Sequence, residues 1–267
     1  MSLKRPIRLA ALFARVSIQN VAAYRFDMMM RIVVSIMHLA SELLVVWTVF
    51  HNTPQIRGWQ WQHMLVLTGV YRMVAGGLRI SILPNMHKLL EDIQKGTLDF
   101  VLLRPVNAQL LVSIREIIIY RLVDVVLGLT VCVIGCVKLH GAVSPVNLAM
   151  FVGVIAAGYV IVYGIWLMLA TLCFWFVRIQ NIEMVFWNVF EAGRYPITIY
   201  PDWLRWALTY ILPLAFITMV PAATFLGDSS KMPTAALGWA CLLAAGMFIV
   251  SNRFWRFGLR HYSGASA

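Results

Sequence analysis

The hydrophobic positions of this chain fall into long runs that short polar segments separate. A helix needs about 20 residues, at about 1.5 Å each, to cross a bilayer core of about 30 Å. No stretch alternates between apolar and polar residues as a membrane strand does, which argues against a β-barrel. The pattern predicts an all-α membrane protein with six spans, five of which fall at residues 31–50, 63–83, 108–137, 146–176 and 234–251.

The fifth span in chain order can be placed in two ways. Asn181–Ile199 is moderately apolar, whereas Trp206–Leu226 is more apolar but contains Pro213 and Pro221. If the first stretch crosses the membrane, the second dips into it from outside as a re-entrant hairpin, which is tolerated where protein surrounds it. If the second stretch crosses, the first lies at the inner face. The pattern leaves both arrangements open.

The third run, residues 108–137, is expected to be one helix that is longer than the membrane is thick. About 30 helical residues extend about 45 Å, so this helix must tilt or project into the cytoplasm. Its first half carries Arg115, Glu116, Arg121 and Asp124. We expect these side chains to form ion pairs on a projecting base or to line a translocation path.

An amphipathic stretch separates the second and third runs, within residues 82–107. Its apolar residues recur at the spacing of one helix face, and its charged residues fall on the other face. The apolar set is Met86, Leu89, Leu90 and Ile93, and the charged set is His87, Lys88, Glu91, Asp92 and Lys95. We expect Pro84 to close the preceding span, Asn85 to cap the new helix and Gly96 to end it. The stretch therefore predicts a short helix that lies on a surface.

The N-terminal residues 1–29 are basic and carry apolar residues at helical spacing, such as Leu9, Leu12 and Phe13. This pattern is typical of a helix that lies in the cytoplasmic interface of a membrane. The long apolar run begins near Met28, and no small-residue cleavage site follows it. We therefore expect the segment to stay on the mature protein and not to serve as a signal peptide.

Composition and charge agree with one transmembrane domain that covers residues 1–267. Hydrophobic residues make up 61% of the chain and charged residues 12%, with a mean hydropathy of +0.80, whereas soluble domains are about 45–50% apolar. The net charge of +11 comes largely from basic residues before the first span and after the last one. Since basic residues mark the cytoplasmic side, we expect both termini in the cytoplasm, a multi-pass protein of the cell inner membrane, and no nucleic-acid partner.

Ionisable residues inside the first two spans need partners, because an unpaired charge in lipid is costly. Glu42 follows His38 by one helical turn in the first span, and Arg72 lies near the middle of the second. Glu42 is a candidate partner for Arg72. Such a pair either joins the two helices or contributes to a substrate path.

The sequence contains no catalytic or metal-binding pattern. The cysteines Cys132, Cys136, Cys173 and Cys241 all fall in apolar runs, where neither a disulfide framework nor a metal site is expected. The histidines are scattered, and the HExxH, GxSxG and nucleotide-binding GxxxxGKS/T motifs are absent. We therefore expect neither an enzyme nor a cofactor in this chain.

Two segments resemble type 2 ABC exporter permeases. The residues Ile93–Asp99, IQKGTLD, followed by Leu102–Asn107, LLRPVN, look like the cytoplasmic loop between the first two helical hairpins of that family. The later run RYP, IYP and WL, which begins at Arg194 and continues to Pro213, is similar to the proline-marked region before the last span of the family.

The resemblance implies partners and site residues. It implies a second permease subunit, of the same or another kind, and separate ATPase subunits that bind ATP and Mg²⁺. It also implies that Met86–Lys95, within residues 84–107, is a coupling helix against the ATPase, with contacts from His87, Lys88, Glu91, Asp92, Lys95, Gly96 and Asp99.

The resemblance also favours one arrangement of the fifth span. It implies that Asn181–Ile199 crosses the membrane and that residues 200–228 form the re-entrant outer segment, with Pro196, Pro201 and Pro213 as its markers. Arg194 and Arg205 would then lie near the outside, where Glu191 and Asp202 offer local partners.

The expected function is that of the permease subunit of an ATP-driven exporter, which moves an amphipathic, drug-like or lipid-like compound outward. The alternative is a secondary transporter or channel whose ion path uses Glu42, Arg72, Glu116 and Asp124. Dependence of transport on ATP or on the proton gradient distinguishes the two.

Overall fold

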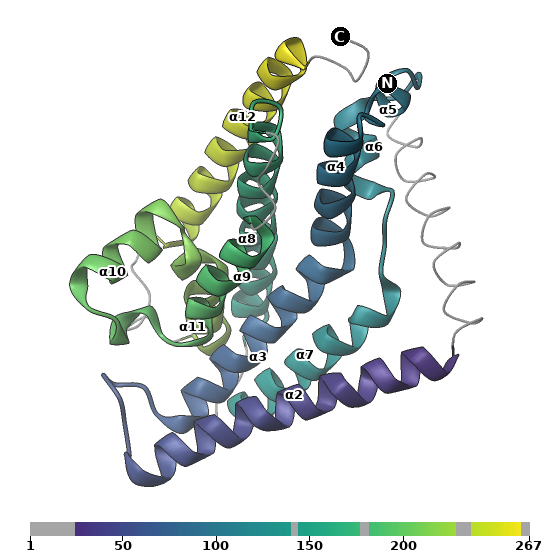
Figure 1. Ribbon diagram of the computed structural model, residues 1–267. Helices are drawn as coiled ribbons and strands as arrows, with labels where there is room; N and C mark the ends of the chain where they lie inside the picture. Colours follow the sequence, from purple (N-terminus) through teal and green to yellow (C-terminus); the bar gives the residue numbers. More distant parts are fainter. Residues whose placement is uncertain (1–24, 140–143, 177–181, 228–235, 263–267) are drawn as a thin grey trace.

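Long apolar helices make up most of the structure (Figure 1). The computed structural model describes residues 25–139, 144–176, 182–227 and 236–262. Within these ranges the regular structure is helical, apart from an isolated β-bridge between Ile56 and Trp59. The helical fold class expected from the hydrophobic runs is confirmed. The expected interfacial helix at residues 1–29 lies outside the described residues, except that residues 25–29 form the start of α2.

Five helices in the described ranges are long and apolar enough to cross a membrane. They are α2 (Arg25–Asn52), the continuous helix of α3 (Trp61–Gly77), η1 (Leu78–Ile82) and α4 (Leu83–Lys95), then α7 (Leu122–Lys138) with the turn before it, α8 (Pro145–Leu172) and α12 (Ala236–His261). Two further helices, bent by 74° between residues 202 and 226, make a sixth span if they count as one. The structure thus has five or six candidate spans, against six expected.

Pro84 does not close the second span, and that expectation is wrong. A proline inside a helix clashes with the carbonyl one turn back and donates no hydrogen bond. Here the turn before it, η1, is a π-helix, in which the Leu83 N–H donates to the carbonyl of Leu78, and such a widened turn makes room for the ring. Asn85 is therefore no cap but a buried residue within the helix. As a result, α4 is a direct extension of α3.

The third hydrophobic run is not one long helix, as the sequence suggested. It forms α6 (Ala108–Ile114), a non-helical stretch at residues 115–118, the 3-10 turn η2 (Ile119–Arg121) and α7. The side chain of Asn85 donates to the Glu116 carbonyl at 2.7 Å and accepts from the Glu116 N–H at 2.9 Å. These bonds satisfy backbone groups that a helix would otherwise pair. The β-branched residues from Ile117 to Ile119 also have only modest helix propensity.

Helices α3 and α7 approach each other at two glycines. A Cβ added at Gly128 would lie 2.6 Å from the carbonyl oxygen of Gly69, and one added at Gly69 would lie 2.6 Å from that of Gly128. Small residues allow such close backbone contact between membrane helices. Arg72 follows Gly69 by one turn and Asp124 precedes Gly128 by one turn, so the contact brings these two charged residues together.

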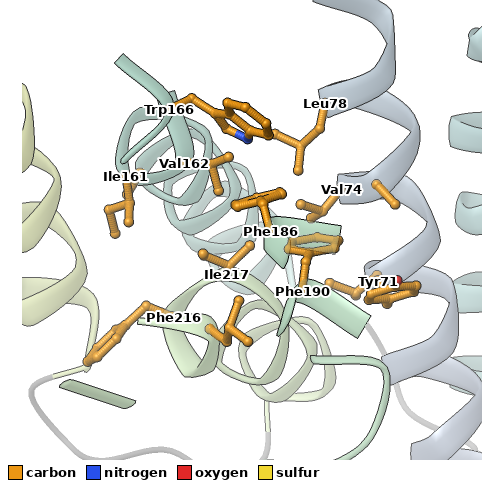
Figure 2. Packing of buried hydrophobic residues seen from close by; sticks show 14 of the residues in the cluster. Tyr71, Val74, Leu78, Ile161, Val162, Trp166, Phe186, Phe190, Phe216 and Ile217 are labelled. Atoms are coloured by element: carbon orange, nitrogen blue, oxygen red, sulfur yellow. The ribbon is translucent and has the colours of Figure 1, made fainter. Parts of the chain in front are cut away.

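Aromatic side chains of α9 (Ile182–Glu191) pack between the longer helices (Figure 2). Phe186 packs on Trp166 of α8 with ring centroids 4.9 Å apart, and Phe190 stacks on Tyr71 of α3 at 5.3 Å. Ile217, from η6 (Ala215–Met219), belongs to the same core (Figure 2). Because buried aromatic rings make large apolar contacts, this cluster fixes the short helix α9 against α3 and α8.

Both stretches considered for the fifth span are broken helices. Residues 182–199 form α9, η3 (Ala192–Arg194) and η4 (Ile197–Ile199), and residues 202–226 form α10 (Asp202–Trp206), η5 (Ala207–Ile211), η6 and α11 (Val220–Leu226). Prolines stand at the breaks: Pro196 directly before η4, Pro201 directly before α10, and Pro213 in the bend between η5 and η6. A proline cannot donate to a continuing helix, which explains why the chain turns at these positions.

The two broken stretches follow different long helices. The first follows α3, since Trp187 contacts Arg79 near the end of α3, whereas Ile199 lies with Trp59 near its start. The second follows α8 from its middle toward its start, since Phe225 packs on Phe151 at 5.0 Å. The first stretch thus runs alongside α3 from one end to the other. The second half of the second stretch, η6 and α11, runs alongside about half of α8.

Candidate functional site

Helix α4 divides into a buried face and an exposed face, as its amphipathic pattern predicted. Met86 and Leu89 are fully buried, and Leu90 is nearly so. On the other face Glu91 lies between three basic side chains, at 3.2 Å from Lys88, 3.7 Å from Lys95 and 3.6 Å from His87. Such exposed pairs contribute little to stability. The exposed face thus presents four charged or titratable side chains at the surface, His87, Lys88, Glu91 and Lys95.

Asp92 does not belong to this exposed face, and the sequence-based assignment is wrong. The residue is 7% exposed, and its carboxylate accepts from Arg115 at 2.6 Å and from the Thr97 hydroxyl at 2.8 Å. Asn85, two helical turns earlier, points to the same side and holds the backbone of Glu116. We call these four residues, Asn85, Asp92, Arg115 and Glu116, the clasp. It fastens α4 to the stretch that leads into η2 and α7.

Gly96 ends α4 in the left-handed conformation, with φ at 67°, as the sequence predicted. The Thr97 and Leu98 N–H groups then donate to the carbonyl of Asp92, which closes the helix end. Asp99 opens the short helix α5 (Asp99–Leu102), which lies beside the end of α4 (Figure 1). Phe100 and Leu103 are 69% and 81% exposed. Apolar residues in a loop of a hydrophobic chain give no signal of their own, so the sequence did not single out these two side chains.

Arg72 links three helices at a buried position. Its Nη1 donates to Glu42 of α2 at 3.0 Å, and its Nη2 donates to Asp124 of α7 at 3.2 Å and to the Ser35 hydroxyl at 3.1 Å. Ser35 in turn donates to Asp124. The structure thus pairs Arg72 with Glu42, the partner that the sequence suggested, and adds Asp124 as a second partner that hydropathy could not locate.

Arg194 joins the same group from η3 and also pairs with Glu191, the local partner that accompanied the position implied by the resemblance. Its Nη2 lies 3.6 Å from Glu42 and 3.7 Å from Glu191, and its guanidinium lies over the ring of Tyr71 at 5.4 Å. Helix α9 ends at Glu191, and the 3-10 turn η3 that follows carries Arg194 within reach of Glu42 on α2. By contrast, Arg205 pairs with the exposed Asp202.

A cavity of about 630 Å³ adjoins this group of charged residues. Five arginines line it: Arg31, Arg72, Arg79, Arg121 and Arg194. Three carboxylates also line it, those of Glu42, Asp124 and Glu191, and we call these eight charged residues the arginine cluster. Buried charges are costly unless they are paired, so this set can act as a polar joint between helices or as a site for a charged ligand. Of the residues that the sequence named, the structure brings Glu42, Arg72, Arg121 and Asp124 together here, whereas Glu116 belongs to the clasp.

The arrangement of arginines and carboxylates around the cavity is suited to recognition of charge. Within the described ranges no group of three or more metal-ligating side chains is close enough to hold a metal ion. Cys132, Cys136 and Cys173 are buried, and Cys241 is exposed.

Comparison with known proteins identifies one family. A family model described as "ABC-2 family transporter protein" matches residues 36–266. The match covers α4, the clasp and most of the arginine cluster. No curated protein gives a significant match to the chain.

Proposed function

The chain belongs to the ABC-2 family of transporter proteins as a multi-pass membrane permease, and from this premise we propose that it exports an amphipathic, drug-like or lipid-like compound. Permeases of this family are transport subunits and are not themselves catalytic. We propose that separate ABC ATPase subunits bind ATP and Mg²⁺ and supply the energy. A second permease subunit, of the same or another chain, completes the assembly.

The observation that carries this proposal is the continuity of α4 with α3, combined with the clasp. Because no break separates α3 from α4, a displacement of α4 moves α3 with it. The ion pair between Asp92 and Arg115 transfers the same displacement to η2 and α7. Both α3 and α7 contribute to the arginine cluster through Arg72 and Asp124. A force applied at α4 thus reaches the membrane-embedded charges by two routes.

The proposed ATPase contact combines charges with apolar anchors. His87, Lys88, Glu91 and Lys95 form the polar part, and Phe100 and Leu103 form the apolar part. Stable interfaces typically bury a few large apolar side chains within a polar rim. In this proposal Gly96 and Asp99 shape the turn between the two parts, whereas Asp92 acts inside the subunit.

We propose that the α4 end of the molecule faces the cytoplasm. The basic end of α12, with Arg253, Arg256 and Arg260, lies at the same end as α4 (Figure 1), and basic residues favour the cytoplasmic side. In this orientation residues 182–199 form a broken fifth span along α3. Residues 202–226 enter from the outer side and return as a re-entrant pair, whose return arm, η6 and α11, is buried against α3 and α8. Both termini then face the cytoplasm. We propose that the protein lies in the inner membrane of the cell.

The test is reconstitution of the chain with a candidate ABC ATPase from the same genome. We expect proteoliposomes that contain both proteins to move an amphipathic dye only when ATP and Mg²⁺ are present on the ATPase side. An ATPase with its catalytic carboxylate neutralised is the matched control. Transport that continues without ATP but collapses with the proton gradient would support the secondary transporter instead.

A further inference from the structure

A second cavity, of about 580 Å³, lies next to the first one. Arg79 and Arg121 line both cavities, so these two arginines stand at the junction between them. The second cavity continues along α4 to Lys88 and His87, and its apolar lining includes Leu83, Ile118 and Trp187. Side by side, the two cavities extend from the exposed face of α4 to the arginine cluster.

Positive charge exceeds negative charge at this junction. Four of the five arginines of the first cavity have carboxylate partners: Arg31 pairs with Asp27, Arg72 with Glu42, Arg121 with Asp124, and Arg194 with Glu42 and Glu191. Arg79 has no carboxylate within ion-pair distance in the part of the chain that the structure describes. Its guanidinium instead lies over the Trp187 ring at 4.4 Å.

Further donors around the junction lack acceptors. The Nε groups of Arg72 and Arg194 are buried and donate to no acceptor among the described residues. Among the described residues that line the second cavity, Glu116 supplies the carboxylate that accompanies Arg79, Arg121 and Lys88. Arg121 and Lys88 have further partners in Asp124 and Glu91, so Arg79 is the cation without an ion-pair partner among the described residues. Unpaired positive charge away from bulk water is unfavourable, and an anion that binds there removes the cost.

We propose that the junction binds the oxyanion head group, a phosphate or a carboxylate, of an amphipathic substrate. The guanidinium groups of Arg79 and Arg121 contact the anion, since arginine forms strong charge-assisted hydrogen bonds with both groups. The apolar part of the ligand lies against Trp187, Leu83 and Ile118. This inference rests on the proposed export function and narrows its substrate class from amphipathic compounds in general to anionic ones.

The experiment measures equilibrium binding to the full-length chain in nanodiscs of zwitterionic phosphatidylcholine, without ATP or ATPase. The probes are radiolabelled decyl phosphate, decyltrimethylammonium as its cationic counterpart, and inorganic phosphate as a competitor without a tail. We expect decyl phosphate to bind more tightly than decyltrimethylammonium. Arg79→Gln should weaken decyl phosphate binding about tenfold or more, as expected for the loss of one charged hydrogen-bond partner, whereas Arg79→Lys should retain most of it. Arg256→Gln, which removes an exposed arginine of α12 outside both cavities, is the matched control.

Several outcomes would overturn the proposal. Equal affinity for the anionic and cationic amphiphiles would do so, and so would an Arg79→Gln variant that binds like Arg256→Gln. The proposal would also be wrong if inorganic phosphate displaced decyl phosphate at equal concentration, because the alkyl chain would then contribute nothing to binding. If nanodiscs of anionic phosphatidylglycerol abolish decyl phosphate binding, a membrane lipid is the occupant and the proposed chemistry stands. If Arg79→Gln does not fold, the test rests on the unaltered chain, which must bind decyl phosphate more tightly than decyltrimethylammonium. If anion binding is not observed, the proposal of ATP-dependent export still stands, because the transport assay tests it separately.

Discussion

Asp92 and Arg115, 23 positions apart in the chain, form an ion pair with 2.6 Å between carboxylate and guanidinium. The pair connects the helix that follows the second span with the stretch that precedes α7. Both side chains are largely buried, at 9% and 14% exposure. Removal of one partner from a buried pair leaves the other charge uncompensated, so the pair is a sensitive point of the fold.

The first prediction concerns this pair. Asp92→Asn should lower the free energy of unfolding by about 3 kcal/mol, because Arg115 keeps its charge without a partner. If the clasp also transmits force, substrate-stimulated ATP hydrolysis by the reconstituted complex should fall. Thermal unfolding and ATPase assays measure the two effects. The double variant Asp92→Asn with Arg115→Met should recover part of the stability, since it removes the stranded charge; a double variant less stable than either single one would argue against the pairing.

The second prediction concerns the apolar anchors beside α4. Leu103→Ala and Phe100→Ala should each weaken binding of the ATPase about tenfold, because exposed large side chains of this kind become the buried centre of an interface. Both residues are largely exposed, so the thermal stability of the permease alone should change by less than about 0.5 kcal/mol. The affinity is measured by titration of the detergent-solubilised chain with the ATPase. Trp203→Ala removes a residue that is 72% exposed on α10 and should have no effect; if it weakened binding equally, the assigned surface would be wrong.

The sequence predicted the parts of the structure that follow from periodicity. Met86 and Leu89 could be assigned to a buried face because helical spacing alone separates them from Lys88 and Glu91. Gly96 could be identified as the helix end because few other residues adopt a positive φ without strain. The pair of Arg72 and Glu42 followed from the cost of charge in lipid and from the order of the two spans.

The parts that sequence could not predict depend on contacts between distant segments. Asp92 looked like one more charge on a polar face, and its burial follows only from the position of Arg115. The break in the third hydrophobic run depends on Asn85, which binds the backbone of a residue 31 positions later. Arg194 belongs to the arginine cluster because the short helix α9 ends just before it. Hydropathy does not predict where a broken helix ends.

The third prediction concerns the contact of α3 with α7. Gly128→Ala would place a methyl group 2.6 Å from the carbonyl oxygen of Gly69, so the two helices must move apart. We expect a loss of about 1–3 kcal/mol in stability, as for other overpacked contacts, measured by thermal unfolding in detergent. Gly153→Ala on α8 is the control, since nothing lies within 4 Å of its Cβ position; it should leave stability unchanged or raise it slightly. Equal losses in both variants would mean that helix propensity and not the close contact governs the result.

The last prediction concerns Arg72, whose two terminal nitrogens serve different carboxylates, Nη1 that of Glu42 and Nη2 that of Asp124. Arg72→Gln should lower stability by about 3–5 kcal/mol, because two buried carboxylates lose a shared partner. Arg72→Lys should not restore the loss fully, since one ammonium cannot reproduce the fork of a guanidinium. Adding Glu42→Gln and Asp124→Asn to Arg72→Gln should recover part of the stability, because without Arg72 each buried carboxylate keeps only one longer ion pair, Glu42 with Arg194 at 3.6 Å and Asp124 with Arg121 at 3.4 Å. Thermal unfolding of the four proteins checks these expectations. If Arg72→Gln were as stable as the unaltered chain, Arg72 would not be the joint between α2, α3 and α7, and its place beside the cavity would need another explanation.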